Sequence, residues 1–163
     1  MNEKIGFTIG KFAPFHKGHE YLIETALKEM DKVVVVVYDT DVINIPTEKR
    51  AEWIKNKYPN VEIRFAHNPP MQYGLDKESV KIQMEYLTKI VGDIQATHFY
   101  SSENYGKSVS EYMNIIDRRV DSERKTNPIS ATEVRKNLEE KKSWIGNNVY
   151  LDCKNNLKTD QLF

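Results

Sequence analysis

Hydrophobic positions fall into two patterns that alternate along the chain. Short β-branched or continuous apolar runs predict strands at about residues 4–9, 33–37, 61–66, 97–100 and 115–120. Apolar residues at helical spacing predict helices at about residues 19–30, 46–58, 76–91 and 130–141. Strands that alternate with helices in this way are typical of a parallel sheet with helices packed against it.

The second predicted strand, at residues 33–37, is valine at every position. A strand with one solvent-exposed face alternates apolar and polar residues, whereas a central parallel strand is buried on both faces. We therefore expect an α/β fold: a single Rossmann-like, doubly wound domain with a mainly parallel five-stranded sheet and helices on both faces. This domain covers residues 1–163, and about residues 142–163 are expected to form a C-terminal helical or lid segment.

Composition narrows the class of protein. The 163 residues include 24 Lys and Arg against 24 Asp and Glu, so the chain has no overall basic field for a nucleic acid. The single cysteine, Cys153, allows no internal disulfide and fits a reducing compartment. No apolar run is long enough to span a membrane, and residues 1–10 lack the layout of a signal peptide. We expect a cytoplasmic protein with neither nucleic-acid nor membrane partners.

Polar segments follow four of the predicted strands. They are residues 10–19, 39–41, 67–74 and 101–106. In open parallel sheets, ligands bind beyond the carboxyl ends of the strands, where the strand order reverses. We therefore expect these segments to meet at one edge of the sheet and to form the binding site.

The first of these segments, GKFAPFHKGH, places His16 and His19 three residues apart where a helix should begin. Both imidazoles can face one side of the first turn, with Gly18 giving access between them and Lys11 adding a cation. Because a helix N-terminus also offers unpaired N–H groups, the segment suits a polyphosphate. Two alternatives stay open: a metal-binding pair, which would need further ligands, and a solvated turn without a role.

A second segment, NPISATEVRKN, has the spacing of a capping box, with Ser130 capping a helix and Glu133 reaching back. This structural role leaves Thr132 and Arg135 unexplained. Arg135 falls in the second turn, from which its guanidinium can reach an anion at the helix start. The segment therefore also predicts a phosphate clamp of hydroxyls, N–H groups and an arginine fork.

Together the two motifs resemble the signatures of the nucleotidyltransferase superfamily, (H/T)-x-G-H and I-S-x-T-x-x-R, which residues 16–19 and 129–135 match completely. The segments GKFAPFHKGHEYLIETA, YSSENYG and VDSERKTNPISATEVRKN are similar to the nicotinamide-mononucleotide adenylyltransferase domain that other proteins fuse to a ribosylnicotinamide kinase. The likeness covers about residues 4–150, with long gaps in the middle.

This resemblance implies an enzyme that moves AMP from ATP onto nicotinamide mononucleotide, giving NAD and pyrophosphate. The acceptor phosphate ionises near neutrality, so catalysis would consist of alignment and of charge stabilisation at the α-phosphorus. Carried over by position, His19 contacts the α-phosphate and His16 the β/γ side. Lys11 lies between donor and acceptor phosphates, and Arg135 holds the leaving pyrophosphate. Mg²⁺ would be held mainly through the phosphates of ATP, without a metal site of the protein's own.

The resemblance assigns further residues to ATP. They are Gly10, Phe12, Gly18, Ser101, Ser102, Glu103, Arg124, Ile129, Ser130 and Thr132. The residues at 101–103 would recognise adenine, and a polar strand-end loop without that role is an equal alternative. Arg124 would reach a phosphate, or else be a surface charge.

Four residues are candidates for binding the acceptor: Asp39, Arg50, Trp53 and Tyr73. Asp39 could instead cap a turn, Arg50 could be a solvated charge, and Trp53 could pack in the core rather than stack on a base. Tyr73 stands in HNPPMQYGLDKESV, where relatives often have tryptophans and this chain has none. Tyr73 is therefore the candidate for stacking on the acceptor base, unless the acceptor differs.

Two alternative functions stay open. One is another adenylyl- or cytidylyltransferase of the superfamily, acting on a different phosphorylated acceptor. The other is a nucleotide-binding sensor without catalysis, which the intact His16, His19 and Arg135 disfavour. The oligomeric state also stays open, with a homo-oligomer as one option because relatives often assemble.

Overall fold

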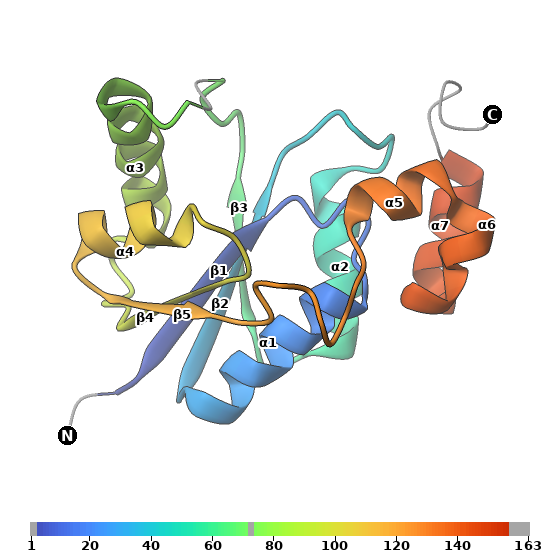
Figure 1. The fold of residues 1–163 in the computed structure, drawn as a ribbon, viewed down its shortest axis with the longest axis horizontal. Helices are drawn as coiled ribbons and strands as arrows, with labels where there is room; N and C mark the ends of the chain where they lie inside the picture. Colours follow the sequence, from blue (N-terminus) through green and yellow to red (C-terminus); the bar gives the residue numbers. More distant parts are fainter. Residues whose placement is uncertain (1–2, 72–73, 157–163) are drawn as a thin grey trace.

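Five parallel strands form the sheet of the computed structural model, which describes residues 3–71 and 74–156. The strand order is β3-β2-β1-β4-β5 (Figure 1). The strands are β1 (Ile5–Gly10), β2 (Lys32–Tyr38), β3 (Glu62–Ala66), β4 (His98–Ser101) and β5 (Ile116–Arg119). Each lies within one residue of its expected bounds, and every pair is parallel, so the predicted fold class is confirmed.

Helices cover both faces of this sheet (Figure 1). The first core cluster joins one face to α1 (Lys17–Glu29) and α2 (Thr47–Lys57). The second joins the opposite face to α3 (Lys77–Val91) and α4 (Gly106–Met113). The strand order reverses at β1, because β2 and β3 lie on one side of it and β4 and β5 on the other. A ligand site is therefore expected beyond Gly10, at the carboxyl end of β1.

The valines of β2 explain why the sheet needs both layers. Val33, Val35 and Val37 belong to the core under α1 and α2, whereas Val34 and Val36 belong to the core under α3. All five are at most 1% exposed. Because successive side chains of a strand point to opposite faces, a run of five valines is stable only with helices on both.

The structure differs from the predicted elements at two places. Helix α4 was not predicted, and the single helix predicted at residues 130–141 is wrong. It is divided into α5 (Ala131–Lys136) and α6 (Leu138–Lys141) by Asn137, whose φ of −136° and ψ of 58° are not helical. The apolar spacing runs on from Val134 to Leu138 across the break, so the pattern alone does not reveal it.

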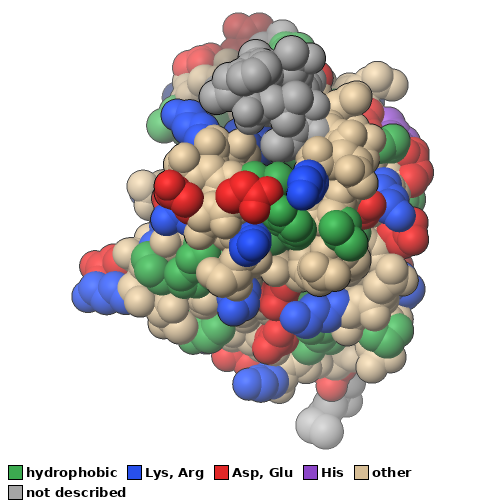
Figure 2. All heavy atoms as spheres, turned by 90° about the vertical axis from the view of Figure 1, so that its right-hand side faces the viewer, with side chains coloured by type: hydrophobic (Ala, Val, Ile, Leu, Met, Phe, Trp, Pro, Cys, Tyr) green, Lys and Arg blue, Asp and Glu red, His purple; other side chains and the backbone are tan. Residues whose placement is uncertain are grey.

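The described part of the C-terminal segment is helical, with a 3₁₀ turn (Lys142–Trp144) followed by α7 (Asn147–Asn156). Val149 and Cys153 of α7 pack in the same core as Trp53 of α2. Acidic and basic side chains are interspersed on this side of the molecule (Figure 2). Within residues 3–71 and 74–156, no helix has the length and apolar character needed to cross a bilayer.

The two-sided burial of β2 predicts the effect of shortening one valine. Val35→Ala should lower the free energy of unfolding by about 2 kcal/mol, because two buried methyl groups are lost at 0% exposure. Ile116→Ala is the control, since Ile116 is 57% exposed and its loss should cost less than about 0.5 kcal/mol. Urea denaturation of both variants measures the difference, and equal losses would contradict this account of the core.

Candidate active site

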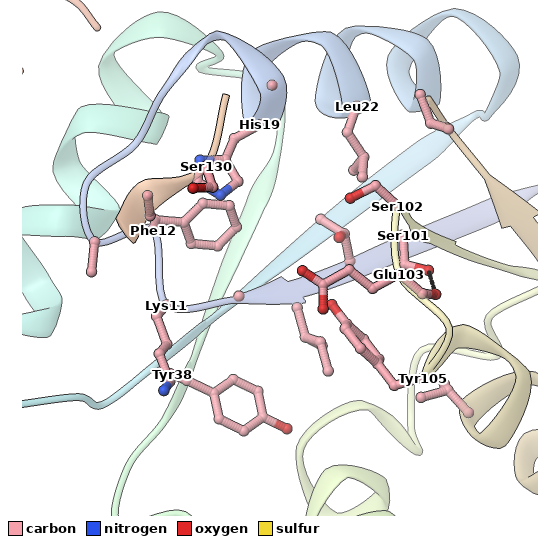
Figure 3. Close-up of a pocket in the computed structure, with 18 of the residues that line it drawn as sticks. Lys11, Phe12, His19, Leu22, Tyr38, Ser101, Ser102, Glu103, Tyr105 and Ser130 are labelled. Carbon is pink, nitrogen blue, oxygen red and sulfur yellow. Dashed lines mark hydrogen bonds between the residues drawn. The ribbon is translucent and has the colours of Figure 1, made fainter. Parts of the chain in front are cut away.

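A cavity of about 680 Å³ opens at the carboxyl end of β1, where the strand order reverses. Five stretches line it: the end of β1 with the loop into α1, the end of β2, residues 74–84, residues 101–109 and residues 120–135 (Figure 3). The volume is in the range of small-molecule and cofactor sites. Of the four polar segments predicted to meet at this sheet edge, residues 10–19 and 101–106 line the cavity. Among the described residues of the third segment only Gly74 reaches it, and residues 39–41 lie between the lining residues Tyr38 and Val42 without lining it themselves.

Two histidines form the start of α1. The Nδ1 atom of His16 accepts the N–H of Gly18 at 3.0 Å, and the Nδ1 atom of His19 accepts the N–H of His16 at 3.1 Å. This is a capping box built from imidazoles instead of a hydroxyl and a carboxylate. Since both Nδ1 atoms accept, each neutral ring carries its proton on Nε2. Both residues line the cavity, which thereby gains two N–H donors.

Gly18 is required by the ring of His16. A Cβ atom at position 18 would lie 2.8 Å from Cε1 and 3.0 Å from Nδ1 of that ring. The two imidazoles stack with their centroids 3.7 Å apart, which leaves no room for a side chain between the ring and the helix. The glycine of the motif thus permits the close approach on which the cap depends.

Burial keeps both imidazoles neutral. It is the main cause that lowers the pKa of His16 from 6.5 to about 4, with the positive charge of Arg124 adding to it. Burial also holds the pKa of His19 well below its ordinary value, with smaller contributions from His16 and Arg124. Near neutral pH the two imidazoles can therefore donate hydrogen bonds, but they carry no positive charge.

Aromatic rings fix the orientation of His19. Phe12 meets its ring edge-on at a centroid distance of 4.8 Å, and Phe15 stacks on it at 6.0 Å. Phe12 has a φ of 49°, a left-handed conformation that is unfavourable for a bulky side chain. Such conformations persist where the surroundings hold them, and they cluster at functional sites. Here the unusual backbone turns the ring of Phe12 toward His19 (Figure 3).

The second predicted motif lies next to the first and also lines the cavity. Ser130 caps α5 through the N–H of Glu133 at 3.2 Å, and its hydroxyl donates to the Glu133 carboxylate, also at 3.2 Å. Arg135 donates from Nη1 to the carbonyl of Ala13 at 2.6 Å and from Nη2 to Oγ1 of Thr132 at 3.3 Å. Arg135 therefore ties the two motifs together, although 122 residues separate it from Ala13.

Residues after β4 and β5 form another wall of the cavity. Arg124 donates from Nη1 to the carbonyl of Ile129 at 2.5 Å and pairs with the Glu103 carboxylate at 3.4 Å. Its φ of 53° and that of Asp121, 50°, are left-handed. Asp121 stabilises this turn by accepting the N–H groups of residues 125–127. Arg124 is thus held beside the histidines, whose pKa values it lowers.

The structure brings most of the predicted donor-side residues to the cavity. Those that line it are Gly10, Lys11, Phe12, His16, Gly18, His19, Ser101, Ser102, Glu103, Arg124, Ser130, Thr132 and Arg135. Ile129 does not, because its side chain is buried in the core and its carbonyl accepts from Arg124.

The acceptor candidates are placed differently. Trp53 is 2% exposed in the core and donates from Nε1 to Asp152 of α7 at 2.8 Å, so the packing alternative holds rather than stacking on a base. Arg50 is 1% exposed and donates to main-chain carbonyls, so it is not a solvated charge. Asp39 accepts from Thr47 and Asn68. None of the three lines the cavity, and Tyr73 lies outside the described residues.

Several cavity residues were missed by the sequence analysis. Tyr38 follows directly after the valines of β2, at a strand end where ligands are expected, so its position was a usable signal. Tyr105 lies in the polar segment at residues 101–106 and also lines the cavity, but only residues 101–103 of that segment were predicted to bind. Val80 and Met84 of α3 reach the cavity from the other face of the sheet, and nothing in their own pattern shows which part of a helix adjoins a site.

The acidic side chains at the cavity are already engaged. Glu103 pairs with Arg124, and Asp121 holds the N–H groups of its own turn. Among the described residues, no group of three His, Cys, Asp or Glu side chains is arranged to hold a metal ion.

Comparison with known proteins agrees with this geometry. The family model described as cytidylyltransferase-like matches residues 7–137. The trifunctional NAD biosynthesis/regulator protein NadR of Salmonella typhimurium is 27% identical over 154 residues. That match covers 83% of this chain and 37% of the relative, so the chain spans little more than a third of its length.

Two solved structures share the fold. A NadR protein in complex with NAD and AMP-PNP superposes with a TM-score of 0.65 at 22% identity, covering 91% of this chain and 46% of that one. A bifunctional NMN adenylyltransferase/ADP ribose pyrophosphatase from Francisella tularensis, complexed with AMP and a manganese ion, also superposes with a TM-score of 0.65. Its identity is 20%, and the match covers 93% of this chain and 52% of that one.

The neutral histidines predict how stability changes with pH. Because the pKa of His16 is lowered from 6.5 to about 4, the unfolded chain binds a proton in this interval that the folded chain does not. Stability should be complete above about pH 6.5 and fall as the pH drops toward about 4. His19 acts in the same direction. His16→Asn keeps an N-cap but removes one titrating group, so its loss of stability in this range should be smaller.

Urea denaturation at pH values across this interval measures the slope for each protein. For one histidine the slope is at most about 1.4 kcal/mol per pH unit. Ile116→Ala, which removes no titrating group and lies at a 57% exposed position, is the control and should leave the slope unchanged. Identical slopes for wild type and His16→Asn would mean that the imidazole of His16 is not held neutral.

Proposed function

Because this chain belongs to the cytidylyltransferase-like family of nucleotidyltransferases, we propose that it transfers AMP from ATP onto nicotinamide mononucleotide, forming NAD and releasing pyrophosphate. The observation that carries the proposal is the pair of Nε2–H donors of His16 and His19 at a cavity that Ser130, Thr132 and Arg135 also line. The distant similarity to NadR favours nicotinamide mononucleotide as the acceptor.

The transfer does not require a general acid or a general base from the protein. A phosphate oxygen of the acceptor attacks the α-phosphorus of ATP, and the bond from that phosphorus to the bridging oxygen of pyrophosphate breaks. The nucleophile is already ionised near neutral pH, and the leaving pyrophosphate is a stable anion. Catalysis therefore rests on alignment and on stabilising the charge that spreads over the phosphoryl oxygens.

In this reaction the neutral histidines act as hydrogen-bond donors. His19, braced by Phe12 and Phe15, donates from Nε2 to an α-phosphate oxygen, and His16 donates toward the β/γ side. A donor that is fixed by a capping bond does not have to reorient as charge develops, which is the condition for electrostatic stabilisation of a transition state. The positive charges come from Lys11, Arg124 and Arg135, which line the same cavity.

The positions of the other substrate groups are inferred from the residues that line the cavity. Ser130, Thr132 and Arg135 hold the β- and γ-phosphates, and Lys11 lies between donor and acceptor phosphates. Adenine lies toward Ser101–Glu103 and Arg124. The acceptor base then takes the opposite part of the cavity, which Tyr38, Val80 and Met84 line with apolar surface. Mg²⁺ enters on the phosphates of ATP and neutralises part of their charge.

One observation supports a second candidate. The loop after β3 has no tryptophan, and the family as a whole is described by cytidylyl transfer. An adenylyl- or cytidylyltransferase that uses another phosphorylated acceptor would keep the same phosphate site and change only the apolar part of the cavity. A sensor without catalysis is disfavoured by the intact histidine donors.

Pyrophosphate release from purified protein with magnesium tests the function. ATP or CTP is offered with nicotinamide mononucleotide, with its deamidated form, or with other phosphorylated acceptors, and the product is identified by mass spectrometry. We expect turnover with ATP and nicotinamide mononucleotide, and NAD as product. Turnover with a different acceptor alone would support the second candidate, and ATP binding without turnover on any acceptor would support the sensor.

Replacing His19 tests its role as a donor in the transition state. His19→Ala should lower kcat by roughly 100-fold or more while changing the Kd for ATP only a few-fold, because the lost hydrogen bond is strongest in the transition state. Initial rates and calorimetric ATP titration measure the two quantities. Thermal unfolding of the variant controls for the lost capping bond. Equal losses in kcat and in ATP affinity would assign His19 to ground-state binding instead.

A further inference from the structure

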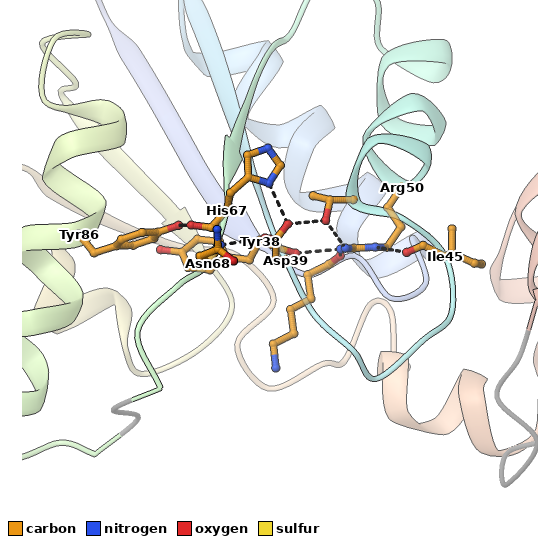
Figure 4. Close-up of polar contacts among 9 residues, drawn as sticks. Tyr38, Asp39, Ile45, Arg50, His67, Asn68 and Tyr86 are labelled. Atoms are coloured by element: carbon orange, nitrogen blue, oxygen red, sulfur yellow. Dashed lines mark hydrogen bonds and ion pairs between the residues drawn. The ribbon is translucent and has the colours of Figure 1, made fainter.

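Arg50 and Asp39, two residues expected at the acceptor, are instead joined in one hydrogen-bond network beside the cavity (Figure 4). The network begins at the buried guanidinium of Arg50. Its Nη1 donates to the carbonyls of Lys11 and Tyr38, the second at 2.9 Å, and its Nε donates to the carbonyl of Ile45 at 3.1 Å. Lys11 and Tyr38 both line the cavity, so Arg50 fixes the backbone of two wall residues at once.

Thr47 connects this guanidinium to Asp39. Its hydroxyl oxygen accepts from Nη2 of Arg50 at 2.8 Å, and the hydroxyl donates to Oδ1 of Asp39 at 2.6 Å. Thr47 is 7% exposed, so water cannot readily replace either bond. The hydroxyl thus bridges the guanidinium of Arg50 and the carboxylate of Asp39.

Asp39 then carries the network to the loop that follows β3. Its Oδ2 accepts the N–H of Asn68 at 2.8 Å, and its Oδ1 lies 3.0 Å from Nδ1 of His67. Tyr86 of α3 donates to the carbonyl of His67 at 2.5 Å. Burial by itself would raise the pKa of Asp39, but the hydrogen bonds from Thr47, Asn68 and His67 lower it, so the carboxylate stays ionised. The same loop leads to Gly74 and Leu75, which line the cavity.

We propose that Arg50, Thr47 and Asp39 are positioning residues for nucleotidyl transfer: they fix the loop of Lys11 relative to the loop that begins at His67. This inference rests on the proposed function, in which Lys11 lies between the two phosphates and the loop after β3 borders the acceptor. In-line attack requires the donor and acceptor phosphates to be aligned closely, and small displacements reduce the rate strongly. A network that spans both loops therefore affects turnover more than the binding of either substrate.

Thr47→Val is the sharpest test, because it keeps the shape of the side chain and removes both hydrogen bonds. With ATP and nicotinamide mononucleotide, we expect kcat to fall roughly 10- to 100-fold and the KM for ATP to change less than about 3-fold. Thr47→Ser restores the hydroxyl and should recover most of the turnover. If Thr47→Val does not fold, Asp39→Asn replaces it, since the carboxylate is the acceptor that the loop and Thr47 share.

Thr97→Val is the matched control. The hydroxyl of Thr97 also joins a hydrogen-bond network, with the backbone of Ile5 and the ring of His98, but at the opposite end of β1 from the cavity. The two variants lose the same chemical group, although Thr97 is less buried than Thr47. A fall in kcat of equal size in both would show a general loss of structure and would overturn the proposal.

Amide hydrogen exchange separates this proposal from the proposed function. Thr47→Val should speed exchange both in residues 11–16 and in residues 67–71, whereas Thr97→Val should leave both segments unchanged. If the wild type turns over none of the acceptors, the proposed function fails, and the exchange data still decide whether the network links the two loops. Unchanged exchange, or a kcat within about 2-fold of wild type, would overturn the positioning role.

Discussion

At the start of α1, the backbone N–H groups of Gly18 and His16 are bonded to the Nδ1 atoms of His16 and His19. The helix could have been capped by aspartate, whose ionised carboxylate only accepts and would have left nothing to donate into the cavity. Imidazole can accept on one nitrogen and donate from the other, so the same bond starts the helix and fixes the tautomer. The position of the donors at the cavity follows from helix formation itself, and further order in the site is built around them.

Three arginines hold the irregular segments around these donors in place. Arg50, Arg124 and Arg135 each donate to main-chain carbonyls of segments at or beside the cavity, those of Lys11, Ile129 and Ala13 respectively. These segments are irregular, so a long side chain with a fork of donors is suited to bonding their carbonyls. Two of the three arginines also line the cavity. In the proposed reaction they would bind phosphate while holding the loops that surround it.

The degree to which the sequence predicted this site varies with the kind of residue. His16, His19, Ser130 and Arg135 were found because they occur in short motifs whose spacing places them at a helix start, and such spacing is a local property. Arg50 was a candidate for the acceptor or else for a solvated charge, because nothing in the local sequence shows that four acceptors surround its guanidinium. Trp53 fitted its apolar helix face, and packing proved to be its role.

The sequence by itself determined the five strands and most of the helices, the burial of β2 on both faces, and the two motifs of the proposed phosphate site, because each depends on residues close together in the chain. Only the tertiary structure decided that Arg135 reaches Ala13, that α3 and α4 bring apolar side chains to the cavity, and that Asp39 and Arg50 hold loops rather than line it. These are contacts between segments far apart in the sequence, and their geometry is set when both faces of the sheet are covered. The apolar periodicity of one segment therefore cannot predict contacts with distant segments.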